Sequence, residues 1–122
     1  MKDVTDLQIY QRALNLLPNV YELASLLPKR EFELRSQLCN SAKSISAHIA
    51  EGFAKKDSQV EFKRFLYMAL GSSDETITHL RQIKLLKFAD EKICDLLVEE
   101  YKIESKQINS LIQKIKNLKS ER

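Results

Sequence analysis

Two pairs of histidine and glutamate, spaced as neighbours on a helix, are the residues of this sequence whose types could bind a metal. His48 precedes Glu51 by three residues, and Glu75 precedes His79 by four. Bundles that bind two metals use Glu-x-x-His pairs with further inward carboxylates. Here one pair is reversed and the other is spaced differently, so we expect no metal site. For His48 and Glu51 we expect hydrogen bonds that fix helix register, along a polar stripe. The stripe consists of Gln37, Ser41, Ser44 and His48.

The two cysteines are not spaced for catalysis or metal binding. Cys39 and Cys94 lie far apart and belong to no CxxC motif. We expect buried thiols that act as small apolar residues. The sequence also has no phosphate-binding glycine loop and no pair of nucleophile and base. We therefore expect a protein that is not an enzyme and uses no cofactor.

Four long helices are the elements expected to position these residues. The chain has 122 residues, and its two glycines and two prolines favour long helices over a turn-rich β fold. Apolar residues recur at helical spacing in four segments with short breaks between them. The sequence thus predicts one all-α domain over residues 1–122, an antiparallel up-down-up-down four-helix bundle. The expected helices cover residues 6–27, 31–54, 58–87 and 90–119.

The segment from Gln37 to Phe53 is expected to be the central helix. Only Lys43 and Glu51 are charged between Gln37 and Gly52. A helix with so little charge is usually covered on more than one side, so we expect a subunit contact as well. The predicted core residues are Leu38, Ile45, Ile49, Leu66, Leu80, Leu97 and Ile112. The predicted oligomer contacts are Ala47, Ala50, Ala54 and Gly71.

Polar residues mark the expected helix ends. The expected N-caps are Asp3, Thr5 or Asp6 for the first helix, Ser58 for the third and Asp90 for the fourth. Ser58 and Glu61 have the spacing of a capping box. Gly71, inside the third helix and away from its core face, indicates either a second close helix approach or exposure to solvent.

Positive charge gathers near the C-terminus. The net charge is +3, and residues 102–122 hold six basic residues and two acidic ones. Such a helix end suits the helix dipole, and it would equally suit a polyanion-binding patch. Three aligned lysines are Lys102, Lys106 and Lys116. A second cluster, at the turn between the second and third helices, is Lys55, Lys56, Lys63 and Arg64.

The N-terminus and the hydropathy favour a cytoplasmic protein. Lys2, Asp3 and Asp6 precede any apolar run, so no signal peptide is expected. No segment approaches the ~18 apolar residues of a membrane span. We expect no membrane partner.

Three motifs occur in order along the chain, and the resemblance that they carry covers almost all of it. Residues 6–13 read DLQIYQRA, residues 44–52 read SISAHIAEG, and residues 65–75 read FLYMALGSSDE. They are similar to D-L-x-V-W-x-x-A, S-I-P-A-N-I-A-E-G and F-L-x-x-A-x-G-S-x-x-E. The chain thus resembles the four-helix-bundle family of intervening-sequence proteins, encoded within large-subunit ribosomal RNA genes of some bacteria. That family includes the accessory protein of diversity-generating retroelements.

The resemblance implies a ring-like homopentamer, binding of RNA or DNA, and no known catalysis. This sequence departs from the family pattern where relatives often carry an Arg-Arg pair, because Cys39 and Asn40 stand there. Ser46 and His48 replace the proline and asparagine of the central motif. Ala54 or Lys55 stands where an arginine usually follows Glu-Gly. If those arginines contact nucleic acid in relatives, that contact is weaker here.

Two classes of function remain. The first is a non-catalytic oligomeric module that binds the nucleic-acid backbone through basic patches, with or without a protein partner. The second is a structural or protein-interaction module with no nucleic-acid binding. Salt-dependent binding of RNA would discriminate between them.

Overall fold

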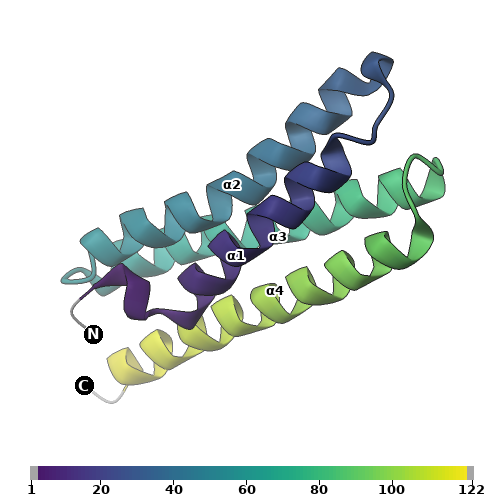
Figure 1. The fold of residues 1–122 in the computed structure, drawn as a ribbon. Helices are drawn as coiled ribbons and strands as arrows, with labels where there is room; N and C mark the ends of the chain where they lie inside the picture. The colour runs from purple at the N-terminus through teal and green to yellow at the C-terminus, as the bar shows by residue number, and fades with distance from the viewer. Residues whose placement is uncertain (1–2, 121–122) are drawn as a thin grey trace.

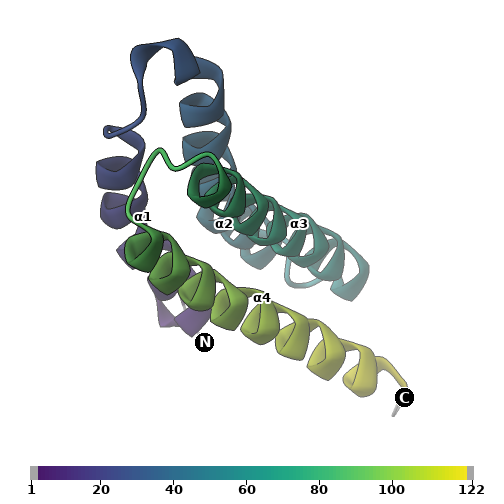
Figure 2. The same ribbon diagram turned by 90° about the vertical axis from the view of Figure 1, so that its right-hand side faces the viewer.

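Four α-helices and two short 3₁₀ helices make up the part of the chain that the structure describes, which contains no strand. The structure is a computed structural model that describes residues 3–120, with the side chains of residues 3–118. In chain order the elements are η1 (Val4–Asp6), α1 (Gln8–Ala24), η2 (Lys29–Glu31), α2 (Phe32–Ala54), α3 (Gln59–Leu85) and α4 (Glu91–Ser120). Consecutive α-helices run antiparallel, and α4 also contacts α1 (Figure 1 and Figure 2). The predicted all-α class with four helices is confirmed.

The apolar faces of the four helices meet in one core cluster. All seven predicted core residues belong to it, and each is at most 4% exposed. The prediction of a core built on these positions is therefore confirmed. Cys39 and Cys94 also lie in the cluster as free thiols, as the sequence indicated.

The residues expected to cap α1 instead cap the short helix before it. The Asp3 carboxylate accepts a hydrogen bond from the Thr5 N–H at 3.2 Å, and the Asp6 carboxylate accepts one from the Asp3 N–H at 3.2 Å. These reciprocal bonds close a capping box around η1. The N-cap of α1 is Leu7, whose side chain is buried and makes no capping bond. The expectation of a polar cap on α1 was wrong because the acids are used one turn earlier.

The C-terminal end of α1 is fixed by an arginine of α2. The Arg35 guanidinium donates hydrogen bonds to the carbonyl oxygens of Ala24, Leu27 and Pro28, at 3.1–3.2 Å. Carbonyl groups at a helix end lack partners within the helix, and a cation is favourable there. The helix stops at Ala24, before the expected residue 27, and the chain turns through the segment that Arg35 holds.

Gly52 allows α2 and α3 to approach closely near the turn that joins them. A Cβ atom built at Gly52 would lie 2.9 Å from the Phe65 Cβ and 3.3 Å from the Phe62 carbonyl oxygen. Both neighbours belong to α3; the contact with the Phe65 Cβ would be a clash, and the contact with the Phe62 backbone would be tight. The position therefore requires glycine for packing.

A chain of hydroxyl groups sets the register of the central helices. Ser44 Oγ lies 2.7 Å from Ser72 Oγ, and Thr76 Oγ1 lies 2.9 Å from Ser41 Oγ, both between α2 and α3. Ser73 continues the series by donating to the Tyr101 carbonyl oxygen of α4 at 3.2 Å. A buried hydroxyl group without a partner destabilises the folded protein. A shift of these helices along their axes would break the hydroxyl pairs and is therefore disfavoured.

The N-terminal ends of α3 and α4 carry the predicted caps. The Ser58 hydroxyl accepts from the Glu61 N–H at 3.2 Å, but the Glu61 carboxylate binds Arg64 at 3.0 and 3.1 Å instead of completing a capping box. Asp90 accepts from the N–H groups of Lys92 and Ile93 at 2.8 and 3.2 Å, as expected for an N-cap.

The two glycines give a matched test of this packing. Gly52→Ala should lower the free energy of unfolding by about 1–3 kcal/mol, because the added methyl group overpacks the contact with Phe65. Gly71→Ala should raise it by up to about 1 kcal/mol, because a Cβ at exposed Gly71 would meet no described atom outside its own helix within 4 Å. Urea unfolding followed by circular dichroism measures both. Equal stabilities of the two variants would contradict the close approach at Gly52.

Candidate functional site

The histidine pairs are held within single helices and do not converge. His79 Nε2 lies 3.1 Å from Glu75 Oε2, and His79 Nδ1 lies 2.9 Å from Gln82 Oε1, all on α3. The buried Nδ1 atom of His48 has no hydrogen-bond partner among the described residues, so it does not make the hydrogen bond that was expected of His48. Within residues 3–120 no group of three His, Cys, Asp or Glu side chains could hold a metal ion.

The two thiols are poorly placed to act as nucleophiles. Burial raises the pKa of both Cys39 and Cys94, so each thiol stays protonated at neutral pH. Nearby Lys43 and Arg35 oppose the shift at Cys39 without reversing its direction.

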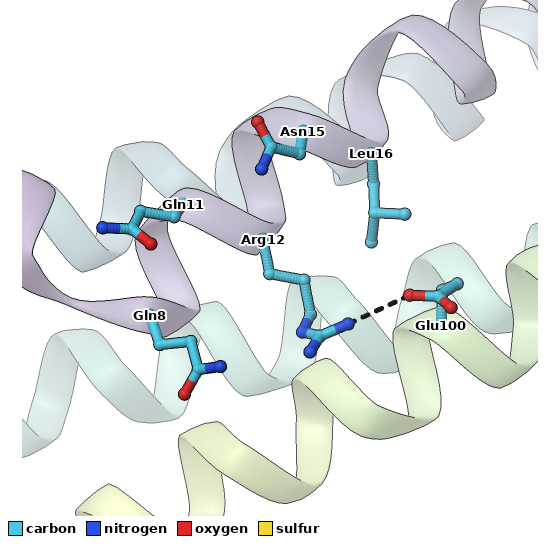
Figure 3. A pocket seen from close by; sticks show the side chains of 6 residues that line it. All are labelled: Gln8, Gln11, Arg12, Asn15, Leu16 and Glu100. Carbon is cyan, nitrogen blue, oxygen red and sulfur yellow. Dashed lines mark hydrogen bonds and ion pairs between the residues drawn. The ribbon is translucent and has the colours of Figure 1, made fainter.

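A shallow polar pocket lies between α1 and α4, but it contains no arrangement suited to catalysis. Figure 3 shows Arg12 reaching from α1 to Glu100 on α4, with an Arg12 Nη1 to Glu100 Oε2 distance of 3.0 Å. Gln8, Gln11 and Asn15 extend the lining along α1. The ion pair is half-exposed, so its contribution to stability is small.

Beside this pocket, α4 buries a carboxylate, Glu104, that was not predicted to lie in the core. Glu104 is 0% exposed, and neither of its oxygens has a hydrogen-bond partner in the described part of the chain. Its nearest cation is Arg12, with Nε 3.9 Å from Oε1. Burial raises the pKa of Glu104 to about 8, although the charge of Arg12 opposes the shift. The spacing from Tyr101 and Ile108, three residues after one and four before the other, is the signal that could have identified it as a core position.

The fold brings one lysine of the C-terminal cluster, Lys116, to the end of the bundle that carries the turn cluster. The turn after α2, the start of α3 and the end of α4 lie at one end of the bundle (Figure 1 and Figure 2). Lys116 of α4 is linked to α3 directly, because its Nζ lies 5.5 Å from the centroid of the Tyr67 ring. We call this surface the basic end. It is formed by Lys55, Lys56, Lys63, Arg64 and Lys116.

Aromatic rings support the cations of the basic end. Lys55 Nζ and the Arg64 guanidinium lie 4.4 and 4.5 Å from the Phe65 centroid, and Lys56 Nζ lies 4.3 Å from that of Phe53. Phe53 and Phe65 are themselves mostly buried, so the rings hold the cations at the surface. Arg64 also pairs with Glu61 at 3.0 Å, which reduces the charge it offers to a ligand.

Lys102 and Lys106, grouped with Lys116 in the sequence, lie nearer the middle of α4. Fourteen residues separate Lys102 from Lys116, which corresponds to about 21 Å along a helix. Lys102 Nζ lies 3.5 Å from Glu99 Oε1. The structure thus places Lys116 with the turn cluster and separates it from the other two lysines.

The side of α2 that faces away from the core is uncovered in the single chain. Ala47 and Ala54 are exposed and Ala50 is half-buried, while α1 and α3 pack on the other sides of α2. Gly71 on α3 is also exposed, and no second close approach occurs there among the described residues.

The profile of the 23S rRNA-intervening sequence protein family matches residues 5–117. The chain belongs to this family. A crystal structure of a protein with unknown function from the S23 ribosomal protein family, from Bacteroides thetaiotaomicron, has the same fold with a TM-score of 0.78. The two chains are 22% identical, and the alignment covers 85% of this chain and 97% of the other. A comparison with curated proteins gave no match. In the described residues, no helix of this intervening-sequence protein is long and apolar enough to span a bilayer.

The buried carboxylate predicts how stability depends on pH. Glu104 has an ordinary pKa of 4.5 and a folded pKa of about 8, so the folded state holds a proton that the unfolded state has released between these values. Stability should therefore fall as pH rises from about 4.5 to about 8, by up to about 1.4 kcal/mol per pH unit. Burial and the charge of Glu104 raise the pKa of neighbouring Tyr101, so this phenol stays protonated over that range.

Glu104→Gln should remove this contribution and flatten the fall, as measured by urea unfolding at several pH values. Glu100→Gln is the matched control, because Glu100 pairs with the same arginine at the surface. If the Glu104→Gln curve ran parallel to that of the wild type, the carboxyl group would not be protonated in the folded protein.

Proposed function

We propose that this intervening-sequence protein is a non-catalytic oligomeric module that binds the backbone of RNA or DNA through its basic end. The observation that carries the proposal is that the α2–α3 turn with Lys55 and Lys56, the start of α3 with Lys63, and the end of α4 with Lys116 lie at one end of the bundle. Lysine contacts to phosphate position a protein on nucleic acid without reading its sequence. We therefore expect affinity with little base specificity.

Assembly would multiply this modest charge. In a ring of five, which the family resemblance implies, each basic end would be repeated around the axis and weak contacts would act together. The exposed side of α2, with Ala47 and Ala54 between Lys43 and Glu51, and the exposed Gly71 of α3 supply two different surfaces. A cyclic ring requires contact between unlike surfaces of neighbouring subunits.

A second candidate function is protein interaction at the opposite end of the bundle. Large apolar side chains are exposed there, around the turns between α1 and α2 and between α3 and α4, where Arg30 lies 6.0 Å over the Phe88 ring. Clusters of exposed apolar residues often mark interaction sites. The exposed apolar residues at this end are Leu26, Phe32, Leu85, Leu86, Ile93 and Leu96.

The salt dependence of RNA binding tests the proposed function. A variant with Lys55, Lys56 and Lys63 changed to glutamine should bind a single-stranded RNA oligonucleotide more weakly. The slope of log affinity against log salt should become shallower by about 2, because each single-strand phosphate contact contributes about −0.7. Fluorescence anisotropy at several salt concentrations measures this slope.

The matched control removes the same charge from the opposite end. Lys29, Lys87 and Lys92 are exposed there, and their change to glutamine should leave the slope within error of the wild type. Equal effects of both triple variants would mean that net charge, not the basic end, drives binding. No binding by the wild type at low salt would favour the protein-interaction function.

The assembly is tested by its mass. Light scattering at micromolar concentration should give about five times the 14.2 kDa chain. Ala47→Glu, which puts a bulky charged side chain at an exposed alanine of α2, should reduce that mass while the helical content stays constant. A stable monomer in the wild type would contradict the ring.

A further inference from the structure

We propose that the nucleic acid bound at the basic end is single-stranded and that one of its bases stacks on Tyr67. The inference rests on the proposed function and adds the form of nucleic acid that this end recognises. Tyr67 belongs to α3, and its ring lies next to Lys116 in the C-terminal half of α4.

Tyr67 is an exposed aromatic residue outside the core. It is 44% exposed and is not part of the core cluster. Tyr101, in contrast, is fully buried, and Tyr10 is half-buried against the core. An aromatic ring that contributes little to the core and lies at the surface has area available to a ligand.

The surroundings of the ring are cationic. Lys63 precedes Tyr67 by one helical turn on α3, so both side chains lie on the same side of that helix. Lys116 Nζ of α4 lies over the ring, 5.5 Å from its centroid. Next to Tyr67, the half-exposed Met68 has its sulfur 4.0 Å from the Arg64 guanidinium. The ring therefore has positive charge on both the α3 and the α4 side.

This combination fits a single strand better than a duplex. Single-strand-binding surfaces join cations that follow the backbone with aromatic rings on which bases stack. In a duplex the bases are already stacked on each other, so a surface tyrosine would gain only a backbone contact. Every base offers a π-face, which agrees with the low base specificity expected of the basic end.

The test compares oligonucleotides that have the same phosphates with and without bases. The probes are a labelled single-stranded oligo(A) RNA, the corresponding single-stranded DNA, an abasic strand of equal length, and a duplex. Tyr67→Leu should weaken binding of both single strands at least fivefold, since stacking on one ring is worth about that factor or more. Its affinity for the abasic strand and its salt slope should equal those of the wild type. Tyr67→Phe should bind like the wild type.

Tyr21→Leu is the matched control, because Tyr21 is 42% exposed and lies on α1, far along the bundle from the basic end. It should leave every affinity unchanged, and thermal melts should verify that all three variants fold.

If Tyr67→Leu binds single strands as tightly as the wild type while the Lys55, Lys56 and Lys63 variant binds weakly, the stacking is wrong and the proposed function stands. Tighter binding of the duplex than of the single strands also overturns the stacking. If the wild type binds none of the probes, both proposals fail.

Discussion

The contact between α2 and α3 is the constraint on which the rest of the structure depends. Gly52 lets α2 approach Phe62 and Phe65, and the hydroxyl pairs farther along fix how the two helices are offset. Overpacking at the first site or a lost hydroxyl partner at the second would each cost about 1–3 kcal/mol. Because Ser73 binds the α4 backbone, the same register carries over to α4. This offset between α3 and α4 places Lys116 beside Tyr67.

That register also gives the bundle two unlike ends. One end carries lysines that rest on aromatic rings, and the other carries exposed leucines, isoleucine and phenylalanine. Neither group contributes much to the core, so packing does not require either composition. A charged end suits a polyanion, and an apolar end suits a protein surface, which is consistent with a module that joins the two.

Much of the fold could be predicted from the sequence because periodicity reports which face of a helix is buried. Ile45, Leu66 and Ile112 were predicted from spacing alone, and all are fully buried. Spacing does not report what a face meets. The role of Gly52 depends on the backbone of α3, and the cap of η1 depends on a 3₁₀ turn of three residues, too short to show a period. The burial of Glu104 was not predicted, because a charged residue is not expected in a core even where the helical spacing gives it a core position.

The candidate site was less predictable, since its residues come from the turn after α2 and from two helices, α3 and α4. The alignment of Lys102, Lys106 and Lys116 is a property of one helix, whereas the basic end depends on where α4 finishes relative to α3. Photo-cross-linking to a single-stranded RNA that contains 4-thiouridine, followed by peptide mapping, tests this surface most directly. The account predicts cross-links in peptides that contain Tyr67 and residues 113–118. Cross-links confined to residues 26–32 and 85–96, at the apolar end, would contradict it.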